Sequence, residues 1–175
     1  ASEVEEAILE LTDQNDVKGL VLDLRGNPGG LLNESVSLCN LFIDKNQEVV
    51  STKGKIKDWE KSYKTMKEPL DKELPLAVLI DQSSASASEI VSGTIQDLDR
   101  GIIVGKKSFG KGLVQQTRKL SYNSQLKVTV AKYYTPSGRC IQALDYTNKN
   151  SDGSVGKVAD SLKTAFKTRN GRTVY

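Results

Sequence analysis

A serine and a lysine are the side chains of this sequence whose types and spacing could support covalent chemistry. Ser86 lies in a serine- and alanine-rich run, residues 83–90, and Lys111 stands between two glycines in residues 109–112. The chain has no histidine, so lysine is the leading candidate for the base, as in the serine–lysine variant of nucleophilic catalysis. Such a base must be neutral, which requires a lysine pKa to fall from about 10.4 toward 7 through burial or a neighbouring cation. The pair predicts a protease-like dyad.

Ser86 also has an ordinary structural explanation. With Glu89 it forms the Ser-x-x-Glu capping box that begins many helices. A serine at a strand-to-helix turn nevertheless places its hydroxyl beside unpaired N–H groups and the positive end of the helix, as an acyl-transfer oxyanion requires. The neighbouring Ser83, Ser84 and Ser88 are competing nucleophiles, and composition alone does not choose among them.

Lys111 likewise has alternative interpretations. Residues 105–112 nearly match the phosphate-binding pattern Gly-x-x-x-x-Gly-Lys-Ser/Thr. Gly112 replaces the hydroxyl residue that would bind magnesium, and residues 113–117 resemble a strand where a phosphate loop needs a helix. Nucleotide binding is therefore disfavoured, and an exposed loop lysine is the commoner fate of such a residue.

Other polar groups could assist the pair. The turn at residues 26–30 could present backbone N–H groups to an oxyanion. Gln115 could hydrogen-bond the lysine amine, and Asp97 lies near the end of the helix that Ser86 would begin. Each of these residues is also compatible with a purely structural role.

Aliphatic runs and helical periodicity predict the elements that must position these residues. Apolar spacing favours helices, and short aliphatic or alternating runs favour strands. Helices are expected over 3–14, 32–42 and 86–98, and strands over 17–24, 47–52, 76–81, 102–104, 113–119 and 126–134. This order predicts a single mixed α/β domain of βαβ units followed by a hairpin.

Two segments fit this core poorly. Residues 53–74 are rich in lysine and acidic residues and predict a surface excursion, either a lid beside a cleft or a solvated loop. Residues 144–175 are polar, with a weak helical pattern over 158–166. The chain is expected to be a fragment of a longer protein.

Composition excludes several classes of partner. The net charge of +3 arises from 25 basic and 22 acidic residues that are interleaved along the chain, which is too balanced for a nucleic-acid or membrane footprint. No apolar run approaches the roughly 20 residues of a membrane helix, and the start has no export signal. Cys39 and Cys140 could form one disulfide, although two free thiols are favoured.

Three blocks, in this order along the chain, carry a family resemblance. Residues 23–30 (DLRGNPGG), 84–90 (SASASEI) and 109–116 (FGKGLVQQ) resemble motifs of the carboxyl-terminal processing proteases, or tail-specific proteases, of peptidase family S41. The resemblance extends over residues 17–142, and residues 170–175 also resemble the family's tail. It implies a fold related to the ClpP and crotonase group.

The resemblance also implies roles for individual residues. Ser86 would be the nucleophile, Lys111 the general base and Gln115 the residue that orients the lysine, while Asp97 matches an aspartate implicated in some members. The oxyanion hole would use backbone amides of Gly29 or Gly30 and of Ala87.

The implied partners are proteins or peptides, bound through extended C-terminal segments by strand addition. Neither a cofactor nor a metal is implied, and no nucleic acid. The PDZ domain of relatives has no counterpart here, so a noncatalytic peptide-binding fragment with an incomplete active site is the alternative. Relatives imply a periplasmic or cell-envelope location for the parent protein.

Overall fold

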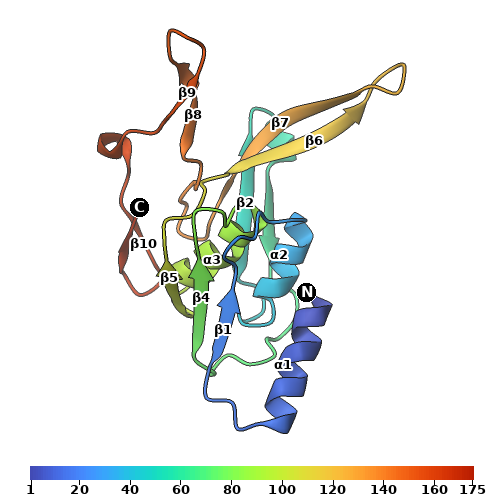
Figure 1. The fold of residues 1–175 in the computed structure, drawn as a ribbon, viewed down its shortest axis with the longest axis vertical. Coiled ribbons are helices and arrows are strands. Elements are labelled where there is room, and N and C mark those ends of the chain that lie inside the picture. The colour runs from blue at the N-terminus through green and yellow to red at the C-terminus, as the bar shows by residue number, and fades with distance from the viewer.

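The computed structural model describes residues 1–175, except for the side chains of Trp59, Thr147, Asn148 and Asp160. A parallel sheet in the order β1–β4–β5 forms one part of the molecule (Figure 1). Its strands are β1 (Leu20–Asp23), β4 (Leu76–Ile80) and β5 (Ile102–Gly105). The aliphatic runs predicted as strands pair in register, with Val78 between Leu22 and Ile103. The mixed α/β class predicted from the sequence is confirmed.

A second, antiparallel sheet has the order β3–β2–β7–β6. Its strands are β2 (Glu48–Gly54), β3 (Lys61–Lys64), β6 (Leu113–Lys119) and β7 (Gln125–Tyr134). The β6–β7 hairpin projects from the body of the molecule (Figure 1). Its inner end is continuous with the loop that carries Lys111.

The helices are α1 (Ser2–Gln14), α2 (Leu32–Cys39) and α3 (Ala87–Asp97). Helix α3 connects β4 to β5 and contacts α2, β2 and β5. Its apolar side chains Ile90, Val91 and Ile95 are buried in one core with Val49 and Val78. Because α3 packs against elements of both sheets, the position of its first residue is fixed relative to both.

Two expectations about local structure need correction. The helical pattern over 158–166 is wrong: this stretch follows β9 (Val155–Lys157), contains the short 3₁₀ helix η2 (Asp160–Leu162) and runs into β10 (Phe166–Lys167). A helix of that length is marginal without packing, and the flanking strands pair instead with β8 (Leu144–Lys149) and β11 (Thr173–Val174). Helix α2 also ends at Cys39 rather than at residue 42.

Residues 53–74 are more regular than a loop. After the 3₁₀ helix η1 (Lys57–Trp59), strand β3 pairs with β2 as the edge of the antiparallel sheet. A lid role for the segment stays a prediction. Cys39 and Cys140 are both free thiols.

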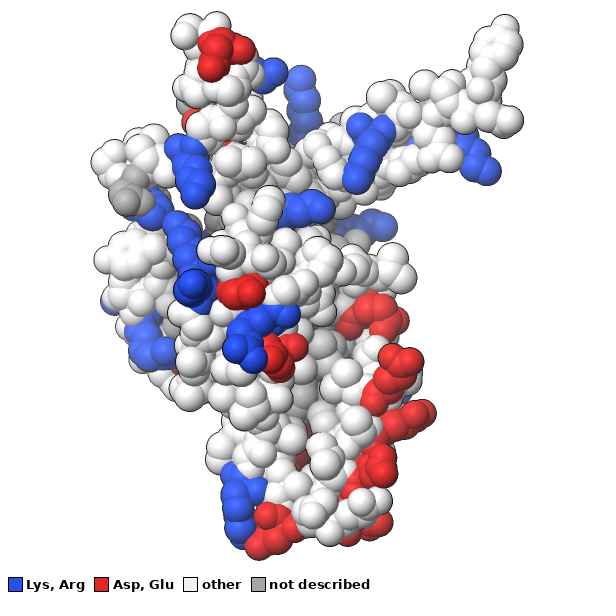
Figure 2. All heavy atoms as spheres, in the orientation of Figure 1, with Lys and Arg blue, Asp and Glu red and all other residues white. Residues whose placement is uncertain are grey.

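Acidic and basic side chains are unevenly distributed over the face of the molecule drawn in Figure 2. Acidic groups gather along the lower right of the view, over α1, and Lys and Arg dominate the upper part, near β6, β7 and β8. In the part of the chain that the structure describes, no helix is long and apolar enough to cross a membrane.

Candidate active site

Ser86 lies at the turn from β4 into α3, as the sequence predicts. It is the N-cap of α3 and has φ 57° and ψ −114°, a positive-φ conformation outside the left-handed helical region that is rare for residues other than glycine and often marks functional sites. Its side chain is half-buried. The preceding Ala85 is held by its N–H, which donates to the carbonyl of Asn27 at 3.0 Å.

Two of the competing serines are engaged elsewhere. The Ser84 hydroxyl is buried and donates to the carbonyl of Leu24 at 2.7 Å, and the Ser88 hydroxyl donates to the carbonyl of Asn27 at 3.1 Å. Both residues therefore attach the start of α3 to the turn after β1. Ser83 is exposed. The Ser84 and Ser88 hydroxyls are thus committed to backbone carbonyls, and the assignment of Ser86 as the nucleophile stays a prediction.

The glycine turn after β1 packs directly against Ser86. Gly29 has φ +91°, and a β-carbon there would lie 2.5 Å from the Ala85 carbonyl oxygen, 2.6 Å from the Ala87 nitrogen and 2.9 Å from the Ser86 β-carbon. Only glycine fits such an approach. A β-carbon at Gly30 would meet nothing within 4 Å.

The predicted oxyanion amides lie around this contact. The N–H of Gly29 donates to the side-chain oxygen of Asn27 at 2.9 Å. Ala87 is the first residue of α3, and the N–H groups of a helix's first turn have no acceptor within the helix. The Gly29 N–H is therefore already engaged, and the oxyanion roles of Gly30 and Ala87 stay a prediction.

Glu89 connects the serine to the lysine loop. Its side chain is buried, with 2% of the residue exposed. Oε2 accepts the N–H groups of Ser86 and Lys111, both at 2.8 Å. Oε1 accepts the Ser108 hydroxyl at 2.7 Å and the Gly110 N–H at 2.6 Å. Four donors thus satisfy a buried carboxylate and hold residues 108–111 against the start of α3.

Tyr133 is a second buried contact between the two segments. Its hydroxyl donates to the carbonyl oxygen of Lys111, and its N–H donates to the Gly112 carbonyl at 3.0 Å. Burial raises the pKa of Tyr133 above its ordinary value, the charge of Glu89 adds to this, and a hydrogen bond with the Ser86 side chain opposes it. Tyr133 therefore stays a neutral hydroxyl between Ser86 and the backbone of Lys111.

The side chains of the predicted dyad lie less close than their backbones. Lys111 is exposed, and among the described residues no hydrogen bond joins its amine to Ser86. Gln115 is also exposed, and its side-chain nitrogen donates weakly to the Thr129 hydroxyl at 3.5 Å. The structure thus brings the segments of Ser86 and Lys111 together without a direct side-chain bond between them.

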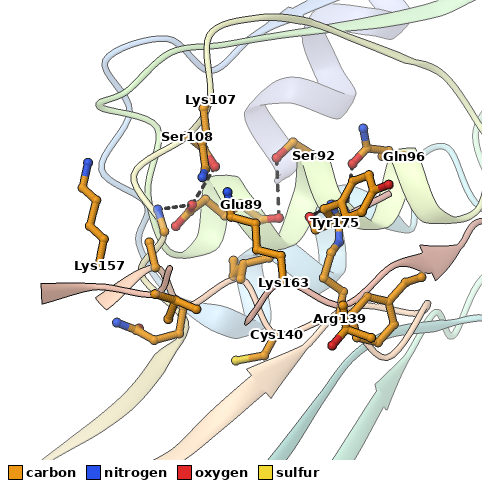
Figure 3. Close-up of a pocket in the computed structure, with 18 of the residues that line it drawn as sticks. Glu89, Ser92, Gln96, Lys107, Ser108, Arg139, Cys140, Lys157, Lys163 and Tyr175 are labelled. Carbon is orange, nitrogen blue, oxygen red and sulfur yellow. Dashed lines mark hydrogen bonds between the residues drawn. The ribbon is translucent and has the colours of Figure 1, made fainter. Parts of the chain in front are cut away.

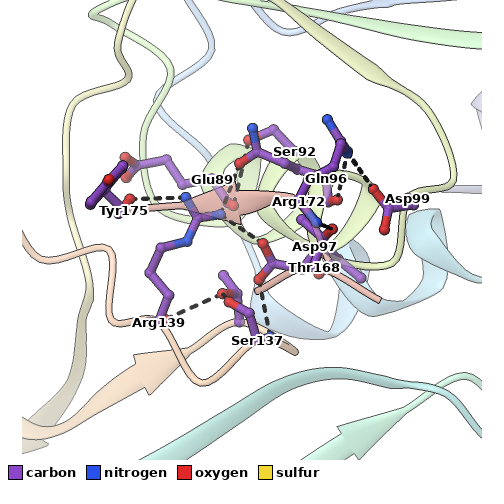
Figure 4. Close-up of polar contacts among 12 residues, drawn as sticks. Glu89, Ser92, Gln96, Asp97, Asp99, Ser137, Arg139, Thr168, Arg172 and Tyr175 are labelled. Atoms are coloured by element: carbon purple, nitrogen blue, oxygen red, sulfur yellow. Dashed lines mark hydrogen bonds and ion pairs between the residues drawn. The ribbon is translucent and has the colours of Figure 1, made fainter. Parts of the chain in front are cut away.

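Asp97 is the last residue of α3 and Ser86 is its N-cap, so the two lie at opposite ends of the helix. Figure 4 shows the polar contacts around Asp97. The eleven residues of α3 separate the two helix ends by about 15 Å. The side chain of Asp97 is fully buried and forms an ion pair with Arg139 at 2.9 Å, and it accepts the Ser137 N–H at 3.1 Å. The guanidinium of Arg139 also donates to the carbonyl of Tyr175 at 3.1 Å. Asp97 therefore anchors the C-terminal segment to α3.

A pocket of about 780 Å³ lies beside this helix, with Glu89 in its wall. Its wall includes Glu89, Ser92, Ser108 and Arg139 (Figure 3). Neither Ser86 nor Lys111 lines it. This cavity is therefore distinct from the predicted catalytic cleft.

Sequence reasoning missed the roles of Glu89 and Tyr133. The capping-box spacing indicated that Glu89 would accept the N–H of Ser86, but it carried no information about donors from residues 108–111. Tyr133 is one of two adjacent tyrosines in an alternating strand. Its burial depends on a strand pairing that no local pattern specifies.

The chain matches a known peptidase family over most of its length. Residues 1–148 match the model of peptidase family S41. The chain is 44% identical over 149 residues to a carboxy-terminal-processing protease of Bartonella bacilliformis, covering 83% of this chain and 34% of the relative. It is 42% identical over 144 residues to a "Probable CtpA-like serine protease" of Staphylococcus haemolyticus, covering 81% and 28%.

A solved structure agrees with these matches. The photosystem II D1 C-terminal processing protease superimposes with a TM-score of 0.71 at 38% identity, over 79% of this chain and 35% of that one. The chain thus spans about a third of the length of such relatives. Given the family match and these identities, the chain belongs to peptidase family S41.

Proposed function

We propose that the chain is the core of a serine endopeptidase in which Ser86 is the nucleophile and Lys111 the general base. The observation that carries the proposal is the shared acceptor: the N–H groups of Ser86 and Lys111 both donate to Glu89 Oε2 at 2.8 Å. Backbones held at that spacing leave the flexible lysine side chain within reach of the serine hydroxyl.

The proposed reaction proceeds through an acyl-enzyme. The neutral Lys111 amine takes the proton of the Ser86 hydroxyl as Oγ bonds to the scissile carbonyl carbon. N–H groups of Gly30 and Ala87 stabilise the oxyanion, beside the positive end of α3. Lys111 then gives the proton to the leaving amine as the C–N bond breaks. Water, deprotonated by the same amine, releases the acid product and restores the serine.

Gln115 and Asp97 have different roles in the proposed mechanism. Gln115 lies four residues after Lys111, in β6, and would orient the amine once its side chain leaves the weak contact with Thr129. Asp97 would act only at a distance, through α3 and Arg139.

The proposed substrates are unfolded or C-terminally tagged proteins, and the proposed location of the parent protein is the periplasm or cell envelope. Both proposals derive from the family. The carboxy-terminal-processing names of the relatives support the choice of substrate.

Cleavage of a denatured protein by the chain tests the proposal, in parallel with a longer form that carries the flanking regions of its relatives. Ser86→Ala and Lys111→Ala should each abolish cleavage. Ser83→Ala and Lys106→Ala, at neighbouring exposed positions, are matched controls and should retain it. Undiminished cleavage by Ser86→Ala would refute the nucleophile assignment.

A noncatalytic peptide-binding fragment is the second candidate. The exposed Lys111 side chain favours it, as does the fact that the chain spans only about a third of its relatives. Peptide binding without cleavage, unchanged by Ser86→Ala in both forms of the chain, would support this alternative.

A further inference from the structure

A second pocket, of about 520 Å³, lies on the antiparallel sheet at the inner end of the β6–β7 hairpin. Three of the residues that line it are Lys53, Lys55 and Lys132, and no acidic residue is among its lining residues. We call this cavity the lysine pocket. The other residues of the lining are uncharged, so every charged group of the lining is positive.

Two of these lysines are placed in an unfavourable arrangement. Lys53 of β2 and Lys132 of β7 are direct partners in the antiparallel pairing, and like charges directly opposite each other destabilise a sheet. The Lys53 ammonium lies 5.0 Å from the centre of the Tyr134 ring, which offsets part of the repulsion. Among the described residues, none of the three lysines forms an ion pair. Natural proteins usually keep such unfavourable local arrangements at functional sites.

The walls between the lysines are suited to a peptide. Leu113, Val130, Leu144 and Tyr146 contribute apolar surface, and Gln115 and Thr129 contribute hydrogen-bonding groups. A concave site with apolar walls and a few convergent polar groups is typical of ligand binding. The three lysines of the lining favour ligands that carry a negative charge.

The wall of the lysine pocket is connected, along the chain and by hydrogen bonds, to the loop that carries Lys111, the proposed base. Leu113 lines the pocket two positions after Lys111. The N–H of Gly112 donates to the side-chain oxygen of Gln142 at 2.8 Å, and the side-chain nitrogen of Gln142 donates to the Leu144 carbonyl at 3.2 Å. Gln142 and Leu144 are both part of the pocket wall. A peptide that reaches Ser86 past Lys111 would therefore meet this wall.

We infer that the lysine pocket is a specificity subsite that binds a carboxylate group of the peptide substrate through Lys53, Lys55 and Lys132. The carboxylate comes from an acidic side chain or from the free C-terminus of the peptide. This inference rests on the proposed peptidase function. It adds a charge preference that the dyad itself does not impose.

Fluorescent peptides of one length and one apolar sequence test the inference by anisotropy, with the Ser86→Ala protein as the receptor. One peptide carries Glu and a C-terminal amide, the second carries Gln and a free C-terminus, and the third carries Gln and an amide. A carboxylate in the pocket should tighten binding about tenfold, and the gain should fall between 50 and 500 mM NaCl because exposed charges are screened. The first two peptides distinguish the source of the carboxylate.

The pocket variant Lys53→Gln/Lys132→Gln should bind all three peptides within about twofold of one another. Lys45→Gln/Lys72→Gln is the control: it removes the same charge at exposed positions outside the pocket and should keep the preference. Thermal unfolding of each variant verifies that it is folded. The inference would be overturned if the Ser86→Ala receptor with all its lysines bound the three peptides equally, or if the preference survived in the pocket variant.

A parallel cleavage assay separates this result from the proposed function. If the neutral peptide is cleaved in a Ser86-dependent manner but no charge preference exists, only the subsite is refuted. If the charge preference holds while no form of the chain cleaves peptide, the catalytic proposal fails and the binding site stands.

Discussion

Ser86 and Lys111 are joined through a single oxygen atom. The backbone N–H of each residue donates to Oε2 of Glu89 at 2.8 Å. One carboxylate oxygen therefore determines the spacing between the start of α3 and the loop before β6. The second oxygen binds Ser108 and Gly110, which limits rotation of the same loop.

Replacing Glu89 with glutamine tests whether this spacing matters for cleavage. The amide keeps the size of the side chain but turns an NH₂ group toward N–H or O–H donors, so two of the four hydrogen bonds are lost. We expect the variant to lose about 2–4 kcal/mol of unfolding free energy and about 100-fold in kcat, with KM little changed. Steady-state kinetics and urea denaturation measure both quantities.

Ser108→Ala is the matched control for Glu89→Gln. It removes one donor and leaves the charge in place, so a loss of about 1 kcal/mol is expected. If Glu89→Gln were destabilised but retained the parent kcat, the carboxylate would serve stability alone.

Gly29→Ala tests the close approach between the glycine turn and Ser86. The new methyl group would lie 2.5 Å from the Ala85 carbonyl oxygen at a φ of +91°, so either the turn or Ser86 must move. We expect a loss of about 1–3 kcal/mol in stability together with most of the activity. Gly30→Ala retains its N–H and meets open space, so both its stability and its activity should stay near those of the parent. Equal behaviour of the two variants would contradict the steric argument.

Asp97→Asn distinguishes a catalytic from an anchoring role. Asn leaves the nearly buried Arg139 guanidinium without its ion pair, and breaking a buried pair typically costs about 3–5 kcal/mol. We expect a lower unfolding midpoint and faster proteolysis within residues 144–175. At temperatures where the variant is fully folded, kcat should stay close to the parent value. A large loss of kcat in a protein of unchanged stability would instead place Asp97 in the reaction.

Cys39 should make the protein less stable at alkaline pH. Burial raises the pKa of its thiol from 9.0 to about 12, although a hydrogen bond with Thr94 opposes the shift. Above pH 9 the unfolded chain therefore loses a proton that the folded protein keeps. The contribution of the Cys39 thiol to the free energy of unfolding is fully present below that pH and is lost as the pH rises toward 12. The slope should approach about 1.4 kcal/mol per pH unit.

Urea denaturation of the parent and of Cys39→Ala between pH 8 and 10.5 measures this contribution. The variant is less stable throughout because it leaves a cavity, but its stability should fall less steeply with pH. Identical slopes for the two proteins would show that the Cys39 thiol does not ionise on unfolding in this range.

Much of the fold could be predicted from local patterns, because the aliphatic runs of β1 and β4 predict strands and the apolar stripe of α3 predicts a buried helix. The position of Ser86 followed from the capping-box spacing with Glu89. The contacts of Glu89 with residues 108–111 and of Asp97 with Arg139 could not be predicted, since each joins segments far apart in the sequence through side chains with no periodic signal. The pattern over 158–166 misled for a different reason: two local hairpins, β8–β9 and β10–β11, flank this stretch and leave only the short η2 between them.

The backbone of Ser86 also limits the evolutionary paths open to this site. A β-branched residue is strongly disfavoured at a φ of 57°. Threonine, a nucleophile in other hydrolases, is therefore excluded by stereochemistry rather than by reactivity. Cysteine is unbranched and fits the same backbone, so a thiol is the alternative nucleophile that single substitutions at this position can reach.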